Sequence, residues 1–99
     1  MIAMKIFYPN CGEDSRFDMD YYINHHMRKA KELAGELCKG ITVESAVNDC
    51  DMPYIAIGTE LWDSIEDYHK ALDPHRDMLV EDIANFTNIK PVIQFFKIE

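Results

Sequence analysis

His26 is the residue whose type and spacing most directly suggest chemistry. It lies one helical turn after Tyr22 and one turn before Ala30, in a segment whose apolar residues recur every three or four positions. Its neighbour His25 falls about 100° around the same helix and is expected to face solvent. An imidazole in an apolar cleft has its charged form disfavoured, so it can act as a neutral acid–base or hydrogen-bonding group near pH 7. The alternative is a core histidine whose ring is satisfied by a backbone carbonyl.

Aromatic and polar residues elsewhere are candidates for a pocket around His26. Tyr22 and Tyr54 carry hydroxyls that could orient a ligand, although aromatic residues on a helix stripe or strand more often belong to the core. We take His26 and Tyr22 as the candidate catalytic residues. The candidate substrate-binding residues are Tyr54, Trp62, Phe86, His75 and Asn85. For the last two, a surface role and a turn-forming role are the alternatives.

Other kinds of site are not expected. The four histidines lack H-x-x-x-H spacing, and Cys11, Cys38 and Cys50 form no C-x-x-C pair, so neither a metal site nor a disulfide is predicted. Widely spaced thiols of this kind are typical of a reducing compartment. The glycines stand singly, so no phosphate-binding loop and no organic cofactor is expected. The pair Glu81-Asp82 has the pattern of a solvated helix face.

Charge and hydropathy limit the partners. The net charge is −8, from 18 acidic and 10 basic residues, whereas nucleic acid binding normally needs a basic surface. No apolar run approaches the ~20 residues needed to cross a bilayer. The N-terminal apolar stretch is short and has no basic segment before it, unlike a signal peptide. We therefore expect a cytoplasmic protein with no nucleic acid partner and no membrane association.

The elements that must position these residues follow from periodicity and capping signals, and residues 1–99 fit one domain. Capping residues are Asp18 and Ser64 at helix starts and Gly40 at the end of the first helix. The predicted elements are strand Ile2–Tyr8, a helix from Met19, strands Ile41–Val47 and Tyr54–Trp62 joined by a turn at Asn48–Asp51, a helix after Ser64, a short helix from Pro74, and strand Ile89–Ile98. This order predicts an α+β, ferredoxin-like βαββαβ fold with a four-stranded antiparallel sheet and helices on one face.

The strands are apolar on both faces, which predicts a partner. In the third strand we place Ile55, Ile57 and Leu61 on one side and Tyr54, Ala56 and Trp62 on the other. Helices can cover only one face, and the other would leave a contiguous apolar patch of the kind that marks an interface. Pairing of two such sheets would give a homodimer with the form of an α+β barrel, whereas the alternative is a monomer with an apolar face.

The segments Phe17–Met27, Pro53–Gly58, Asp73–His75 and Asn85–Gln94 resemble the EthD family, in order and over the whole chain. The family takes its name from bacterial degradation of ethyl tert-butyl ether. The resemblance implies the dimeric α+β barrel fold and a pocket between the first helix and the sheet. The family pattern D-x-D-Y-Y…H-M-P maps its histidine to His26 and its tyrosine to Tyr22. Arg28 stands where many members have proline, which predicts an unkinked helix and a cation near the pocket rim.

The leading functional hypothesis is an enzyme that acts on a small, largely apolar organic molecule without an organic cofactor. Oxygenation or oxidoreduction, proton-transfer isomerisation, and cyclisation or decarboxylation remain open as reaction types. The alternative of a different class is a non-catalytic binding or carrier protein for a hydrophobic metabolite. Haem handling is a third possibility, which would require an axial histidine and a larger cavity.

Overall fold

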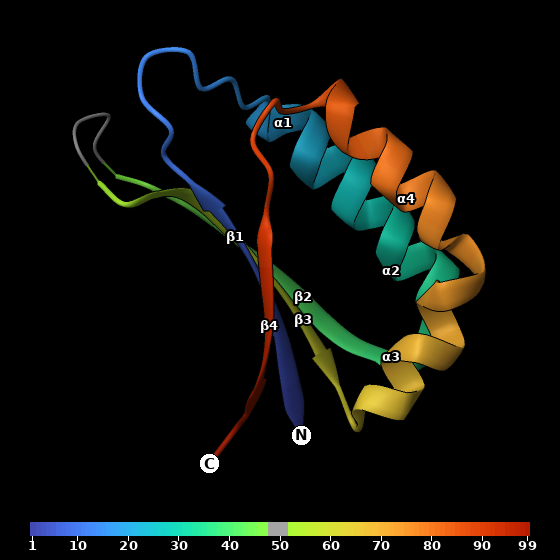
Figure 1. Ribbon diagram of the computed structural model, residues 1–99. Coiled ribbons are helices and arrows are strands. Elements are labelled where there is room, and N and C mark those ends of the chain that lie inside the picture. The colour runs from blue at the N-terminus through green and yellow to red at the C-terminus, as the bar shows by residue number, and fades with distance from the viewer. Residues whose placement is uncertain (48–51) are drawn as a thin grey trace.

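Four antiparallel strands form one sheet in this computed structural model, which describes residues 1–47 and 52–99. The strand order is β2-β3-β1-β4, with β1 paired to both β3 and β4 (Figure 1). The strands are β1 (Ile2–Pro9), β2 (Cys38–Ser45), β3 (Tyr54–Trp62) and β4 (Val92–Lys97). The predicted α+β ferredoxin-like fold is confirmed. The turn predicted at Asn48–Asp51, which includes Cys50, lies outside the described residues.

Two helical segments cover one face of this sheet (Figure 1). The first consists of α1 (Met19–Tyr21), the π-helical turn η1 (Tyr22–Met27), α2 (Arg28–Ala34) and the 3₁₀ turn η2 (Gly35–Leu37). The second consists of α3 (Ile65–Leu72), η3 (Asp73–His75), α4 (Arg76–Asp82) and η4 (Ile83–Asn85). Within the described residues, no helix is both long and apolar enough to cross a membrane.

Capping interactions fix where the helices begin and end. The Asp18 carboxylate accepts from the backbone N–H of Tyr21 at 3.1 Å, and the Ser64 hydroxyl accepts from that of Asp67 at 3.1 Å, as the sequence predicts. The prediction that Gly40 ends the first helix is wrong. The α-helix ends at Gly35, whose φ of +59° favours glycine, and the chain has already entered β2 at Cys38.

The last strand is shorter than predicted. Residues Ile89–Ile98 were expected as a strand, whereas β4 covers only Val92–Lys97. Pro91 has no N–H to donate to a ladder, and Ile89 is buried at 4% exposure as part of the preceding loop. The strand therefore begins immediately after the proline.

A bulge in β3 changes which face two of its residues occupy. The pairing of β1 with β3 is regular from Ile2 to Tyr8 and then shifts, so that Pro9 pairs with Tyr54. The Tyr54 ring consequently lies against Phe7, with ring centroids 5.3 Å apart, on the face without helices, and Ile55 packs toward the core. The prediction that Tyr54 shares a face with Ala56 and Trp62 is wrong because a period of two cannot anticipate the extra residue of a bulge.

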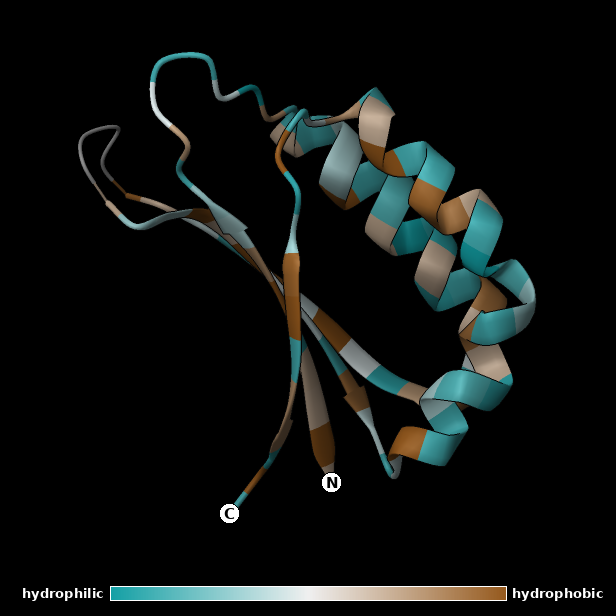
Figure 2. Cartoon of the chain, in the orientation of Figure 1, coloured by the Kyte–Doolittle hydropathy of each residue, from teal (hydrophilic) through white to brown (hydrophobic). Residues whose placement is uncertain are grey.

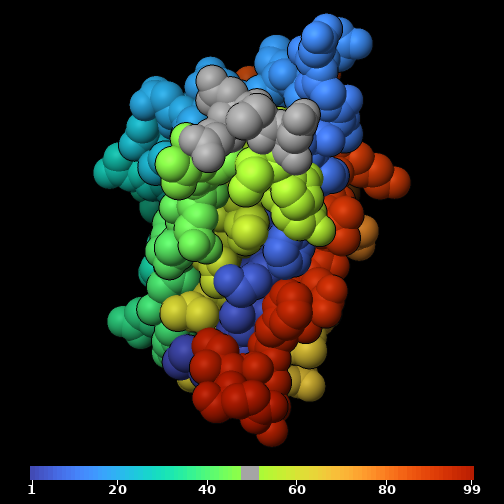
Figure 3. Space-filling view, turned by 90° about the vertical axis from the view of Figure 1, so that its left-hand side faces the viewer, coloured from blue at the N-terminus to red at the C-terminus, as the bar shows by residue number. Residues whose placement is uncertain are grey.

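The face of the sheet without helices carries two largely apolar rows, one of which ends in Glu44, separated by a polar row. Cross-strand pairing defines the rows as Gly40, Leu61, Ala3 and Phe96; Thr42, Thr59, Lys5 and Gln94; and Glu44, Ile57, Phe7 and Val92. The Lys5 ammonium donates to the Thr59 hydroxyl at 3.2 Å within the polar row. Apolar strand segments are visible in Figure 2, and Figure 3 looks onto this face, where the four strands lie side by side.

Hydrogen bonds connect the loop before β4 to the loop that leads into the first helix. The Thr87 hydroxyl donates to the backbone carbonyl of Arg16 at 2.6 Å, and the Arg16 N–H donates to Asn88 Oδ1 at 2.8 Å. The Asp18 N–H donates to the carbonyl of Phe86 at 2.7 Å. These contacts fix the start of the helix that carries His26 and seat Phe86, which is fully buried, beneath it.

Candidate functional site

His26 is buried between the helices and paired with a carboxylate from the second helical segment. Its Nδ1 lies 2.9 Å from Oδ2 of Asp82, and its residue exposure is 7%. Burial lowers the pKa of the imidazole below its ordinary value, and the Asp82 carboxylate partly offsets that effect. Since a carboxylate only accepts hydrogen bonds, Nδ1 carries the proton of the neutral ring. Nε2 is then left with a free lone pair, as a general base requires.

Asp82 is held by three donors and differs from what its sequence neighbourhood predicts. Besides His26, the Tyr21 hydroxyl donates to Oδ1 at 2.7 Å and the Asn85 amide donates to it at 3.0 Å. Desolvation opposes ionisation of Asp82, but these hydrogen bonds outweigh it and lower the pKa of the carboxyl. The prediction that Glu81-Asp82 forms a solvated face is therefore wrong for Asp82, which is half-buried and engaged.

A π-helical turn sets the direction of the His26 ring. In η1 both His26 and the adjacent Met27 are buried, together with Tyr22, whereas Ile23 is 43% exposed although it falls on the predicted apolar stripe. The wider π-turn brings Met27, five positions after Tyr22, to the same side as His26, whereas a regular period of 3.6 groups only residues three and four positions apart. His25 is exposed, as predicted.

Arg28 does not lie at the rim of the cavity, where the sequence predicted a cation. Its guanidinium points outward and lies 3.6 Å from Glu32, with 70% of the side chain exposed. The helix at this point is neither kinked by proline nor regular, because the π-turn ends at Met27, directly before it. The predicted cation at the pocket rim is supplied instead by Arg76, on α4.

A cavity of about 320 Å³ lies between the helices and the sheet, and His26 lines it. Apolar side chains from both layers make up most of its wall, among them Met4, Ile6, Leu79 and Phe95. Two polar side chains of the sheet, Tyr8 and Glu60, line the same space, and besides His26 the helical layer contributes Tyr68, His69, Asp73 and Arg76. The cavity therefore combines an apolar interior with a small number of acid–base groups.

Glu60 is the functional candidate that the sequence-based analysis missed. It is 3% exposed on the central strand β3, and its Oε1 has no hydrogen-bond partner among the described residues. Desolvation by burial raises the pKa of its carboxyl to about 7. A signal was present, because alternation along the strand puts Glu60 on the inward face with Ala56 and Trp62.

Tyr22 is buried next to His26, but it faces the core and not the cavity. Its ring is stacked with that of His26 at 5.9 Å between centroids and forms an edge contact with Tyr8 at 5.3 Å. Its hydroxyl has no hydrogen-bond partner among the described residues and lies against Gly58, whose missing Cβ leaves room for it. Burial raises the pKa of this hydroxyl well above its ordinary value.

The other predicted site residues are only partly brought together. Phe86 lies 4.8 Å from the His26 ring, between centroids, and Asn85 reaches the site through Asp82. Trp62 is fully buried against Tyr68, and neither it nor His75 lines the cavity. Tyr54 lies on the opposite face of the sheet, as described above. The site therefore contains two of the five predicted substrate-binding residues, and both act behind the cavity wall.

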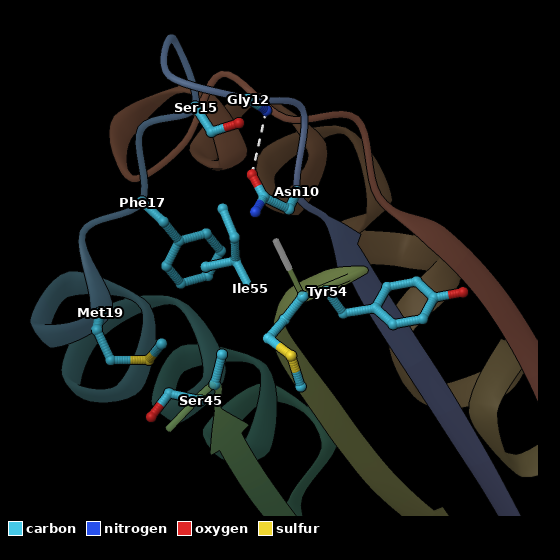
Figure 4. A pocket seen from close by; sticks show the side chains of 10 residues that line it. Asn10, Gly12, Ser15, Phe17, Met19, Ser45, Tyr54 and Ile55 are labelled. Carbon is cyan, nitrogen blue, oxygen red and sulfur yellow. Dashed lines mark hydrogen bonds between the residues drawn. The ribbon is translucent and has the colours of Figure 1, made fainter. Parts of the chain in front are cut away.

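Two of the hollows outside this cavity are lined by residues discussed above. One, of about 330 Å³, is at the end of the sheet, and neither carboxylate nor imidazole lines it (Figure 4). Its Asn10 Oδ1 accepts from the N–H of Gly12 at 3.1 Å, and the Tyr54 ring points away from Phe17 and Ile55 (Figure 4). The other, of about 550 Å³, is a groove on the outer surface between the first helix and α4, and Asp82 lines it.

Metal-binding chemistry has no cluster to support it in the part of the chain that the structure describes. No group of three or more His, Cys, Asp or Glu side chains there could hold a metal ion. Cys38 is buried and its thiol pKa is raised by desolvation, and Cys11 is exposed.

Comparison with known proteins identifies relatives by structure. No family model and no curated protein sequence matches the chain. An EthD-like protein from Ralstonia eutropha JMP134 shares 32% identity over 97% of this chain and 89% of its own, with a TM-score of 0.87. An ethyl tert-butyl ether degradation (EthD) family protein from Bacillus halodurans C-125 shares 12% identity, with 100% and 99% coverage and a TM-score of 0.74. A dimeric ferredoxin-like protein of unknown function from Thermobifida fusca YX shares 14% identity, with 98% and 90% coverage and a TM-score of 0.64.

The topology and the one-sided helical layer define a ferredoxin-like α+β protein with a cavity between helices and sheet. Within that class, the family is shown by the 32% identity to the Ralstonia protein, which covers 97% of this chain and 89% of that one. The chain belongs to the EthD family.

The contact between Tyr22 and Gly58 gives a first prediction. Gly58→Ala should lower the free energy of unfolding by about 1–3 kcal/mol, because the new Cβ overlaps the Tyr22 hydroxyl. Gly40→Ala is the matched control and should be close to neutral, since its Cβ would be 3.6 Å from Leu61. Tyr22→Phe alone should cost nothing, because it removes a buried hydroxyl without a partner, and should rescue Gly58→Ala. Urea denaturation measures all four variants, and additive effects would contradict the contact.

Glu60 gives a second prediction, which concerns pH. Its pKa is about 7 in the folded state, above the ordinary 4.5, so folded protein retains the proton that unfolded protein releases. Stability should therefore fall as pH rises from about 5 to 8, by about 3 kcal/mol from this group. Glu60→Gln lacks this component, so denaturation curves of variant and wild type should diverge with pH. Parallel pH dependences would show that Glu60 ionises normally.

Proposed function

We propose that this protein binds a small, largely apolar organic molecule in the cavity between helices and sheet and exchanges a proton with it through His26. The observation that carries this proposal is the His26–Asp82 pair, with Nδ1 and Oδ2 2.9 Å apart, at the wall of an otherwise apolar cavity. A neutral imidazole with one nitrogen fixed by a carboxylate and the other facing a ligand space is suited to general acid–base catalysis.

The His26–Asp82 pair extends from the cavity to the outer surface. His26 lines the inner cavity, whereas Asp82 lines the outer groove and has 24% of its side chain exposed. A proton taken up at Nε2 creates an imidazolium that the Asp82 carboxylate stabilises across the Nδ1 hydrogen bond. Because Asp82 borders solvent, charge at the pair is stabilised without opening the cavity.

The wall composition supports the ligand class. The space of about 320 Å³ is large enough for a molecule of one or two rings, and apolar side chains dominate its surface. Two carboxyl groups, those of Glu60 and Asp73, line the cavity, and the net charge of the protein is −8. Both features disfavour an anionic ligand. A carrier protein would need the cavity but would not need an oriented histidine, so the ordered pair favours an enzyme of proton-transfer type over the carrier alternative.

We further propose that the functional unit is a homodimer formed through the sheet face without helices. Apolar residues of that face include Val92, which is 56% exposed, and the half-buried Phe7 and Phe96. These rings and the Ile57 and Leu61 side chains form the two apolar rows described above. The Thermobifida neighbour of the same fold is dimeric, which supports this arrangement for the present chain.

Ligand binding in the cavity is a third prediction. The neutral fluorescent probe N-phenyl-1-naphthylamine should bind the wild type and shift the His26 imidazole signals in NMR spectra. Ala30→Leu places added carbon atoms in the cavity and should weaken binding about tenfold or more, whereas Ala84→Leu, at an exposed position, is the matched control. Equal affinities for the two variants, or an unmoved His26 signal on binding, would argue against this cavity.

The dimer is a fourth prediction. Sedimentation equilibrium at micromolar concentration should give twice the chain mass of 11.5 kDa. Val92→Glu should shift the protein to monomer, because it buries a charge in the proposed interface. Val80→Glu is the control, since Val80 has almost the same exposure, 57% against 56%, but lies on the helical side. A wild-type monomer, or equal behaviour of both variants, would refute the sheet-face dimer.

A further inference from the structure

Among the described residues, no hydrogen bond to Oε1 and no ion pair accounts for the burial of Glu60. A carboxyl group removed from water normally has a hydrogen-bonding or charged partner, because an unpaired one is costly. Glu60 is 3% exposed and its Oε1 lacks any partner in the part of the chain that the structure describes. The side chain stands on β3 between Met4 of β1 and Ile41 of β2 and lines the cavity from the sheet side. An unpartnered buried carboxyl on a residue that lines the cavity is a candidate ligand contact.

Burial keeps a share of Glu60 in the neutral acid form. No ion pair with Glu60 is present among the described residues. The pKa of about 7 that burial produces means that a large share of Glu60 is protonated at neutral pH. The other titratable side chains that line the cavity are Tyr8, His26, Tyr68, His69, Asp73 and Arg76. Of these, Tyr8 and Tyr68 also have raised pKa values, so neither supplies a charge.

We propose that Glu60, as a carboxylic acid, donates a hydrogen bond to a carbonyl oxygen of the ligand while His26 faces a carbon next to that carbonyl. This inference rests on the proposed function and adds the substrate class: an apolar ketone, lactone or related molecule with an enolisable C–H. A carbonyl oxygen accepts the hydrogen that Glu60 presents, and the rest of the molecule meets the apolar wall. A hydrocarbon of the same shape would leave Glu60 unpartnered.

The chemical step balances within the site. Nε2 of His26 takes the proton from the carbon next to the carbonyl, and the C–H electron pair becomes the carbon–carbon double bond of the enol. The carbonyl π electrons move to oxygen, which receives the proton of Glu60, so His26 becomes imidazolium and Glu60 carboxylate. Return of both protons regenerates the residues, and delivery of the carbon proton to another position isomerises the substrate. No oxidant, reductant or metal is required.

The two residues approach the ligand from opposite layers. His26 belongs to the helical layer and is held by Asp82, whereas Glu60 belongs to the central strand of the sheet. An acid and a base on opposite sides of a bound molecule are the arrangement that concerted enolisation uses.

A matched pair of probes tests the inference. 2-Tetralone and tetralin share one carbon skeleton and differ in the carbonyl group. Wild-type protein should bind 2-tetralone about tenfold more tightly than tetralin, as expected for one well-placed hydrogen bond. It should also accelerate exchange of the C1 hydrogens of 2-tetralone with D₂O, followed by NMR.

Three variants separate the roles. Glu60→Leu should bind both probes equally and leave tetralin affinity unchanged. Glu60→Gln retains an N–H donor but cannot transfer a proton, so it should keep the preference for 2-tetralone and lose about 100-fold in exchange rate. His26→Gln should abolish accelerated exchange with little change in affinity. If Glu60→Leu fails to fold, Glu60→Gln still decides between the outcomes through its exchange rate.

The outcomes distinguish this inference from the proposed function. If wild type binds the two probes equally, or if Glu60→Gln exchanges as fast as wild type, the role of Glu60 is overturned while the cavity remains a ligand site. If neither probe binds the wild type or shifts the His26 signal, the proposed function fails and this inference fails with it. If exchange is lost only in His26→Gln, His26 acts alone and Glu60 is not the acid.

Discussion

The hydrogen bond between His26 Nδ1 and Asp82 Oδ2 is the contact on which the arrangement of the site depends. It joins two residues that are 56 positions apart in sequence, one in each helical segment. The side-chain hydrogen bonds between these segments in the described part of the chain all centre on the same place, because Tyr21 and Asn85 also converge on Asp82. The helical layer is thereby fixed over one end of the sheet, and the cavity lies beneath it.

Two carboxyl groups with opposite environments follow from this geometry. Asp82, at the end of α4, faces an outer groove and accepts from three donors, so it remains ionised and fixes the tautomer of His26. Glu60, on the sheet, is buried and its Oε1 has no hydrogen-bond partner among the described residues, so it retains its proton to a higher pH. The proposed roles use this difference: Glu60 is the proposed acid, and His26, held by the ionised Asp82, is the proposed base. The fold produces this difference because one group lies in the outer layer and the other at the floor of the inner cavity.

The fold and the burial of His26 could be predicted from the sequence because their signals are local. Strand alternation, the caps at Asp18 and Ser64, and the helical stripe that contains His26 each lie within a short window. Asp82 could not be found in this way, because its partner is far away in sequence and Glu81-Asp82 has the pattern of a surface pair. The bulge that turns Tyr54 outward and the π-turn that buries both His26 and Met27 break the regular periods on which such predictions depend. Glu60 had a visible signal, an acidic residue at an inward strand position, which the emphasis on apolar alternation overlooked.

The rigidity of the supporting elements distinguishes this pair of acid–base groups from polar residues on loops. Glu60 is on β3, which is hydrogen-bonded on both sides, to β1 and to β2, so its Cα has little freedom to move. His26 is on a helix whose start is held by the Phe86–Asn88 loop and whose ring is fixed by Asp82. Catalytic geometry must be maintained to a fraction of an ångström, and groups on packed helices and central strands satisfy that requirement better than groups on loops. Asn85 and His75, which the sequence equally offered as polar candidates, lie on short 3₁₀ turns at the periphery, where Asn85 positions Asp82 and does not reach the ligand space.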